Sequence, residues 1–61
     1  MSDWHPVARE PRVPRSGFYR LGVADGTGAI IPIMLEYYLG SGYPIKIFPF
    51  LAYVTHWRRI D

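Results

Sequence analysis

The sequence predicts a mainly α-helical protein: a short helical hairpin formed by residues 27–39 and 47–60, preceded by an irregular basic arm. Two observations predict this class. Nearly all the apolar residues lie in two short blocks between Ala29 and Trp57, and the run Gly40–Gly42 separates the blocks. In the first block the apolar residues recur every four positions, which places them on one face of a helix. We therefore expect a basic, proline-containing arm at residues 1–20 and a single apolar domain at residues 21–61.

The arm is expected to be irregular because prolines interrupt it and apolar residues are sparse. It holds three prolines and four arginines against Asp3 and Glu10, a surplus of two positive charges. No secretory signal peptide is visible, because the first twenty residues lack a continuous apolar stretch.

The first helix is expected at residues 27–39. Two rows of apolar residues define its buried face: Ile30, Met34 and Tyr38, and Ile31, Leu35 and Leu39. Asp25 or Thr27 can cap its start, and Gly40 can end it in the left-handed conformation. Pro32 would kink such a helix or mark its true first turn.

The second helix is expected at residues 47–60, opened by Pro49. Its apolar face would carry Phe50, Leu51, Val54 and Trp57. His56, Arg58 and Arg59 would then lie in the last turn, where cations interact favourably with the negative end of the helix dipole.

A small all-β meander is the alternative. It would contain a strand at residues 17–23, a turn at Asp25-Gly26, a strand from Ala29, a turn at Gly40–Gly42 and the alternating residues 45–47. Pro32 and Pro49 favour the helical hairpin, because proline removes a ladder hydrogen bond from a central strand.

The residues give little support to catalysis, so we expect no enzyme, no metal and no cofactor. His5 and His56 lie far apart, cysteine is absent, and no zinc-ligand spacing occurs. Ser16 and Ser41 have no base placed by the sequence, and so short a chain seldom holds a catalytic site rigidly.

The apolar blocks instead point to a covering partner or membrane. A chain of 61 residues without cysteine buries only about 60% of its unfolded surface and has no disulfides to compensate. We expect a small accessory subunit, associated with the cytoplasmic side of an inner membrane, that packs on larger membrane-protein subunits and touches an anionic lipid surface. Its basic arm would lie on the cytoplasmic side.

Particular residues are assigned to these contacts. The partner would be contacted by Ile31, Leu35, Leu39, Phe48, Phe50, Leu51 and Val54, and the interfacial anchors would be Trp4, Trp57, Arg58 and Arg59. Glu36 and Lys46 fall in the most apolar window and argue against a lone membrane span, since each charge costs about 2.5–3.5 kcal/mol at the bilayer centre. Within a hairpin they could form an ion pair.

A soluble binding module for nucleic acid or a protein is the alternative function. Arginines lie among the aromatic residues Phe18, Tyr19 and Trp57, a composition that can bind nucleic acid. The formal net charge is only +2, so phosphate contacts alone would give weak, salt-sensitive binding.

The first half of the chain also carries a resemblance to a known family. Trp4 near the start, arginines before Phe18-Tyr19, then Asp25, a run of small residues and an apolar segment opened by Pro32 resemble the IcmT/TraK-type small membrane proteins of type IVB secretion and conjugation systems. The resemblance covers Trp4 to Leu35. It implies an inner-membrane component of a translocation machine with no catalytic role.

Overall fold

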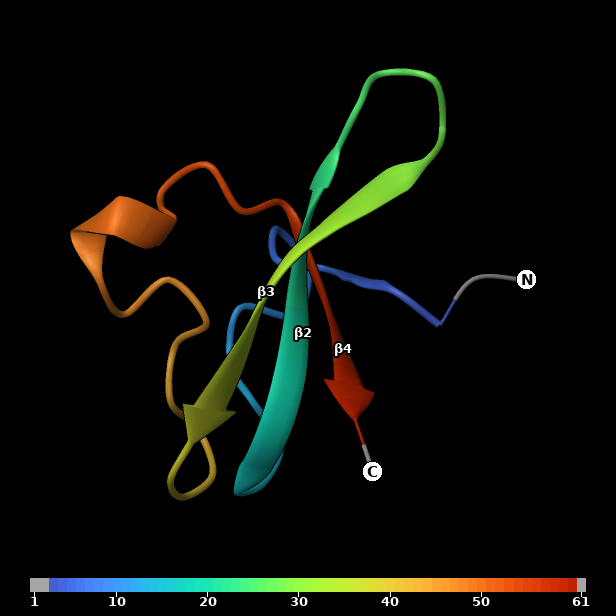
Figure 1. The fold of residues 1–61 in the computed structure, drawn as a ribbon. Coiled ribbons are helices and arrows are strands. Elements are labelled where there is room, and N and C mark those ends of the chain that lie inside the picture. The colour runs from blue at the N-terminus through green and yellow to red at the C-terminus, as the bar shows by residue number, and fades with distance from the viewer. Residues whose placement is uncertain (1–2, 61) are drawn as a thin grey trace.

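The computed structural model describes residues 3–60 and shows a four-stranded antiparallel sheet in the order β1-β4-β2-β3 (Figure 1). Residues 1–2 of the expected arm and residue 61 of the expected apolar domain lie outside the described residues. The elements are β1 (His5–Pro6), β2 (Gly17–Ala24), β3 (Ile30–Tyr38), the 3-10 helix η1 (Pro49–Leu51) and β4 (His56–Ile60). β2 and β4 are therefore the central strands, and β3 forms an edge.

The helical hairpin is wrong, and the fold is a small all-β sheet, the class of the alternative. It is not a simple meander, because β4 pairs with β1 and β2 and not with β3. Residues 27–39 form the tip of a β-hairpin and the edge strand β3, while residues 47–60 contain only the three-residue η1 and the strand β4. The recurrence of apolar residues every four positions fits both conformations. Four residues are close to one helical turn and are also two repeats of the two-residue period of a strand. Isoleucine-rich segments favour the strand.

Pro32 is compatible with a strand because β3 lies at the edge of the sheet. The pairing of β2 with β3 shifts register between Leu21 and Gly22: Leu21 pairs with Met34 and Gly22 with Pro32, so Ile33 is an extra residue. Edge strands and bulges are among the places where a sheet tolerates proline. Pro49 begins η1 and lies in no strand.

The hairpin tip uses Asp25 as a turn residue, where a helix cap was expected. The Asp25 carboxylate accepts hydrogen bonds from the Thr27 backbone N–H at 2.8 Å and from the Thr27 hydroxyl at 2.6 Å. These two bonds, with the hydroxyl first, lower the pKa of Asp25. Aspartate commonly closes a turn on the backbone two residues later.

The expected membrane-embedded hairpin is not present, because residues 27–39 and 47–60 do not form the two helices that would make it. Within residues 3–60, no helix has both the length and the apolar character needed to span a membrane. The membrane assignment depended on two adjacent apolar helices, and these residues instead form a twisted sheet with irregular connections.

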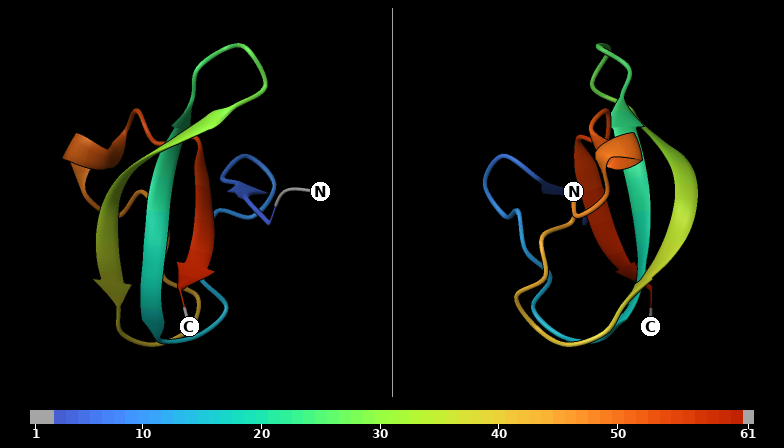
Figure 2. Two further views of the ribbon diagram at one scale, coloured as in Figure 1. Left: turned by 45° about the vertical axis from the view of Figure 1, so that its right-hand side comes forward. Right: turned by 90° about the vertical axis from the view of Figure 1, so that its left-hand side faces the viewer.

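The core lies on one face of the sheet. The connections from β1 to β2 and from β3 to β4 both cross this face, and the opposite face is open (Figure 2). The buried side chains come from the strands and from both connections: Val7, Val13, Tyr19, Leu21, Tyr38, Ile45, Leu51, Val54 and Trp57. The expected N-terminal arm thus contributes Val7 and Val13 to the same core, and Trp57 Nε1 donates a hydrogen bond to the Glu10 carbonyl at 2.7 Å.

Gly22 marks a close approach on the open face. A Cβ atom there would lie 2.7 Å from Ile30 Cγ2 and 3.1 Å from both the Ile31 carbonyl oxygen and Trp4 Cη2. We expect Gly22→Ala to lower the free energy of unfolding by about 1–3 kcal/mol, because backbone and a large ring must both move. Urea denaturation measures the change, with Ser41→Ala in an exposed turn as the control. Equal urea midpoints for Gly22→Ala and the unmodified chain would show that a Cβ atom at position 22 is accommodated without cost.

Candidate interaction surface

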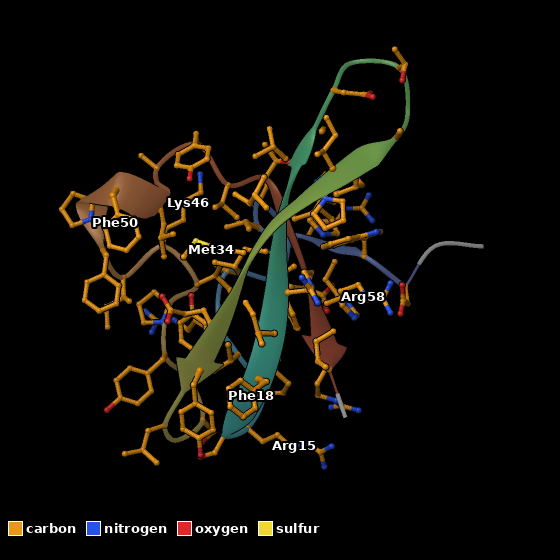
Figure 3. All side chains as sticks on the ribbon, viewed as in Figure 1. Arg15, Phe18, Met34, Lys46, Phe50 and Arg58 are labelled. Carbon is orange, nitrogen blue, oxygen red and sulfur yellow. The ribbon has the colours of Figure 1, made fainter. Side chains whose placement is uncertain are left out.

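Two pairs of exposed aromatic side chains lie on the sheet and near η1. On the open face of the sheet, Phe18 of β2 and its partner Tyr37 of β3 meet edge to face, with ring centroids 4.9 Å apart. Phe48, the last residue of the connection, stacks on Phe50 of η1 with ring centroids 5.6 Å apart. Figure 3 shows Phe18 on the sheet and Phe50 at η1.

A small hollow joins these two aromatic pairs. Its volume is about 190 Å³, and its lining consists of Tyr37, Tyr38, Leu39, Tyr43, Ile47 and Phe48. None of these side chains carries a charge at neutral pH. We call this feature the aromatic hollow.

Hydrogen bonds fix the backbone of the connection that forms the aromatic hollow. Residues 42–45 pair with residues 11–13: the Gly42 N–H donates to the Val13 carbonyl at 2.7 Å, the Val13 N–H donates to the Tyr43 carbonyl at 2.9 Å, and the Ile45 N–H donates to the Pro11 carbonyl at 2.7 Å. Gly40 and Gly42 have φ of +95° and +82°, which few residues other than glycine adopt freely. The exposed side chains are therefore presented by an ordered backbone.

Hydrogen bonds from the side chains of Tyr38 and Lys46 also hold this connection in place. The Tyr38 hydroxyl donates to the Ile45 carbonyl at 2.6 Å, and burial, together with the nearby Glu36 carboxylate, raises the pKa of Tyr38 to about 12. The Lys46 amino group donates to the Ala52 carbonyl at 3.0 Å and so closes the connection over η1. On this connection and η1, Ile45 and Leu51 are buried, whereas Ile47 and Phe50 are exposed.

The structure divides the residues that were expected to contact a partner. Ile31, Leu35, Leu39, Phe48 and Phe50 are exposed, whereas Leu51 and Val54 are fully buried in the core. Leu39 and Phe48 line the aromatic hollow, while Ile31 and Leu35 belong to β3. Sequence reasoning did not single out Tyr37, Tyr43 and Ile47, the remaining exposed residues of the hollow. The position of Tyr43 directly after the Gly40–Gly42 turn could have indicated that residue.

The expected interfacial anchors do not share one environment. Trp57 is buried, whereas Trp4 is partly exposed and has the Arg58 guanidinium 5.6 Å from its ring centroid. Arg58 Nε also lies 3.5 Å from Asp3 Oδ2, and Arg59 lines a different hollow. Glu36 and Lys46 form no ion pair with each other in the described part of the chain, and Lys46 points to Ala52.

A second hollow, of about 340 Å³, lies beside β1 and is lined by Asp3, His5, Glu10, Pro14, Trp57 and Arg59. His5 stacks on Trp57 with ring centroids 4.5 Å apart, and its Nδ1 lies 2.6 Å from Glu10 Oε2. The lining mixes carboxylates with a guanidinium, so it favours no single charge. Among residues 3–60, no group of three potential ligands from His, Cys, Asp or Glu is placed to hold a metal ion.

Basic residues on the open sheet face form only a small cluster. Arg20 of β2 lies directly opposite Arg58 of β4, near Phe18 and its partner Ile60. Asp3 already neutralises part of the Arg58 charge. This cluster offers few phosphate contacts, whereas eleven large hydrophobic side chains are exposed among the described residues.

Comparison of the chain with protein families, curated proteins and solved structures finds no match.

Proposed function

We propose that this chain is a small, non-catalytic binding module that holds an extended, uncharged peptide segment of a protein partner in the aromatic hollow. The observation that carries the proposal is the uncharged lining of the hollow, which includes one ring of each exposed aromatic pair, Tyr37 and Phe48. Eleven large hydrophobic side chains are exposed among the described residues. Exposed apolar patches on a protein surface mark interaction sites.

The size of the aromatic hollow favours a side chain of a larger partner over a free small molecule. Small-molecule sites usually have volumes of about 300–1,000 Å³, and this hollow has about 190 Å³. A bound peptide could place one apolar side chain in the hollow and lay its neighbours along Phe18 and Phe50. Aromatic residues supply much of the binding energy at protein interfaces.

Tyrosine hydroxyls provide the polar contacts that such a peptide requires. The hydroxyls of Tyr37 and Tyr43 form no hydrogen bond within residues 3–60, while the Tyr38 hydroxyl is committed to Ile45. Hydroxyls without such a bond can donate to peptide carbonyl groups. The ordered backbone beneath them reduces the entropy lost on binding.

The test is a selection of random peptides displayed on phage against the immobilised protein. We expect the selected peptides to share an apolar residue and to bind Tyr43→Ser at least about tenfold more weakly than the unmodified chain, because a central aromatic contact is lost. The matched control is Tyr53→Ser, since Tyr53 is exposed but does not line the aromatic hollow. Fluorescence anisotropy with labelled synthetic peptides measures the affinities.

Three outcomes would overturn the proposal. One is the absence of any enriched peptide, and another is equal binding to Tyr43→Ser and Tyr53→Ser. The third uses a labelled oligothymidylate: salt-sensitive binding that Arg20→Glu abolishes, without peptide binding, would identify a nucleic-acid module. Melting curves for each variant confirm that the fold is retained.

A further inference from the structure

We propose that the peptide held in the aromatic hollow also carries an acidic residue, whose carboxylate binds to Arg20 of β2 and Arg58 of β4. The inference rests on the proposed function, because it specifies the residues that flank the apolar side chain in the hollow. The segment inside the hollow stays uncharged, and the acidic residue lies beside it on the open face of the sheet. The partner segment thus combines an apolar anchor with a nearby carboxylate.

Arg20 and Arg58 lie directly opposite each other on the two central strands. Both side chains project on the open face, because successive residues of a strand alternate between faces. Tyr19 and Leu21 on either side of Arg20 are fully buried in the core, as is Trp57 before Arg58. Like charges directly opposite each other destabilise an antiparallel pair. The sheet therefore holds two guanidinium groups together although they repel each other.

Little negative charge from the described residues balances this arginine pair. Arg20 forms no hydrogen bond or ion pair with any of residues 3–60. Asp3 Oδ2 lies 3.5 Å from Arg58 Nε but accepts no hydrogen bond from it, and both side chains are accessible to solvent. Ion pairs at such exposed positions are weak. The arginine pair therefore keeps most of its positive charge for a carboxylate of the partner.

Aromatic rings border the arginine pair at both ends along β2. Phe18 precedes Arg20 by two residues and Gly22 follows it by two, so all three share the open face. The Trp4 ring lies over Gly22, and its centroid is 5.6 Å from the Arg58 guanidinium carbon. A guanidinium can donate two parallel hydrogen bonds to one carboxylate. This setting favours an acidic side chain over an uncharged one.

The register of the sheet sets the distance from the aromatic hollow to the arginine pair. Tyr37, which lines the hollow, lies opposite Phe18, and Arg20 is two residues further along β2. Diagonal neighbours of this kind, such as Tyr37 and Arg20, are about 7–8 Å apart. An extended peptide advances about 3.3 Å per residue, so the acidic residue should lie about two to four residues from the apolar anchor. It should always lie on the same side of the anchor.

The test uses the tightest-binding peptide from the phage selection, labelled with fluorescein. The anchor is located by alanine substitution in the peptide, and each flanking position is then made glutamate or glutamine. At low ionic strength we expect glutamate to bind about three- to tenfold more tightly than glutamine at one position on one side of the anchor. The difference should shrink as salt is added.

Arg20→Gln should abolish the preference for glutamate and leave the affinity for the glutamine peptide unchanged. Arg9→Gln is the matched control, because it removes the same charge from an exposed residue in the connection from β1 to β2. It should keep the preference. Arg20→Gln should also raise the melting temperature of the free protein by a few degrees, since it removes the like-charge pair.

The outcomes separate this inference from the proposed function. Equal affinity for glutamate and glutamine at every position, an equal loss of preference in Arg9→Gln, or a lower melting temperature for Arg20→Gln would overturn the inference. If Tyr43→Ser still weakens peptide binding in those cases, the peptide site itself stands. Failure to select any peptide, or salt-sensitive binding of oligothymidylate alone, would overturn both.

Discussion

Leu51→Ala should destabilise the fold by about 2–5 kcal/mol, whereas Phe50→Ala should change its stability by no more than about 0.5 kcal/mol. The two residues are neighbours in η1, yet Leu51 is 0% exposed and Phe50 is 57% exposed. Truncating Leu51 removes buried methyl groups and leaves a cavity among Ile45, Val54 and the rest of the core. Truncating Phe50 removes a side chain that mainly contacts solvent and Phe48.

Urea denaturation followed by tryptophan fluorescence measures both changes, since Trp57 lies in the core. A core of this size seldom supplies more than about 3–5 kcal/mol, so we expect Leu51→Ala to be largely unfolded even without urea. Near-ultraviolet circular dichroism would then show the loss of packing directly. Comparable destabilisation by the two substitutions would mean that η1 does not separate a buried side from an exposed side.

Tyr38 should make the fold sensitive to alkaline pH. Its pKa rises from an ordinary value of 10.0 to about 12 in the folded state, primarily because burial disfavours the phenolate. Below pH 10 the phenol is protonated in both states, so its contribution to stability is fully present. Between pH 10 and about 12 the unfolded chain loses this proton more readily than the folded chain does. Stability should therefore fall across that interval, by about 2–3 kcal/mol in total.

Tyr38→Phe isolates this contribution. At neutral pH the substitution should cost about 1–3 kcal/mol, because the buried Ile45 carbonyl loses its hydrogen-bond donor. Above pH 10 the variant should lose less stability than the unmodified chain, so the difference between them should shrink as pH approaches 12. Urea midpoints across this pH range test the prediction. Parallel pH profiles for the two proteins would exclude Tyr38 as the titrating group.

The sequence predicted the turns of the fold better than its regular elements. The turns at Asp25-Gly26 and Gly40–Gly42 are present, because their short polar and glycine residues satisfy local backbone requirements. The strand expected at residues 17–23 in the alternative corresponds to β2. Residues 45–47 alternate in polarity but form no strand, since Ile45 instead bonds to Pro11 and Lys46 to Ala52.

The candidate site was only partly accessible to sequence reasoning. The surplus of apolar residues over what a short chain can bury was evident, and exposed Leu39 and Phe48 were among the expected contacts. Leu51 and Val54 could not be separated from Phe50, because all three fit one face of a helix. Their true positions depend on how the connection after β3 crosses the sheet. Tyr37 and Tyr43 come together only through that crossing.

By itself, the sequence determined the amount of apolar surface, the positions of the main turns and the lack of a recognisable catalytic pattern. These properties depend on composition and on interactions between near neighbours. Only the tertiary structure decided between helix and strand, because Ile30, Met34 and Tyr38 satisfy both periodicities. It also placed Pro32 at a sheet edge, where the missing N–H costs little, and so removed the main objection to the sheet. The choice depended on hydrogen-bond partners distant in sequence, which no local pattern specifies.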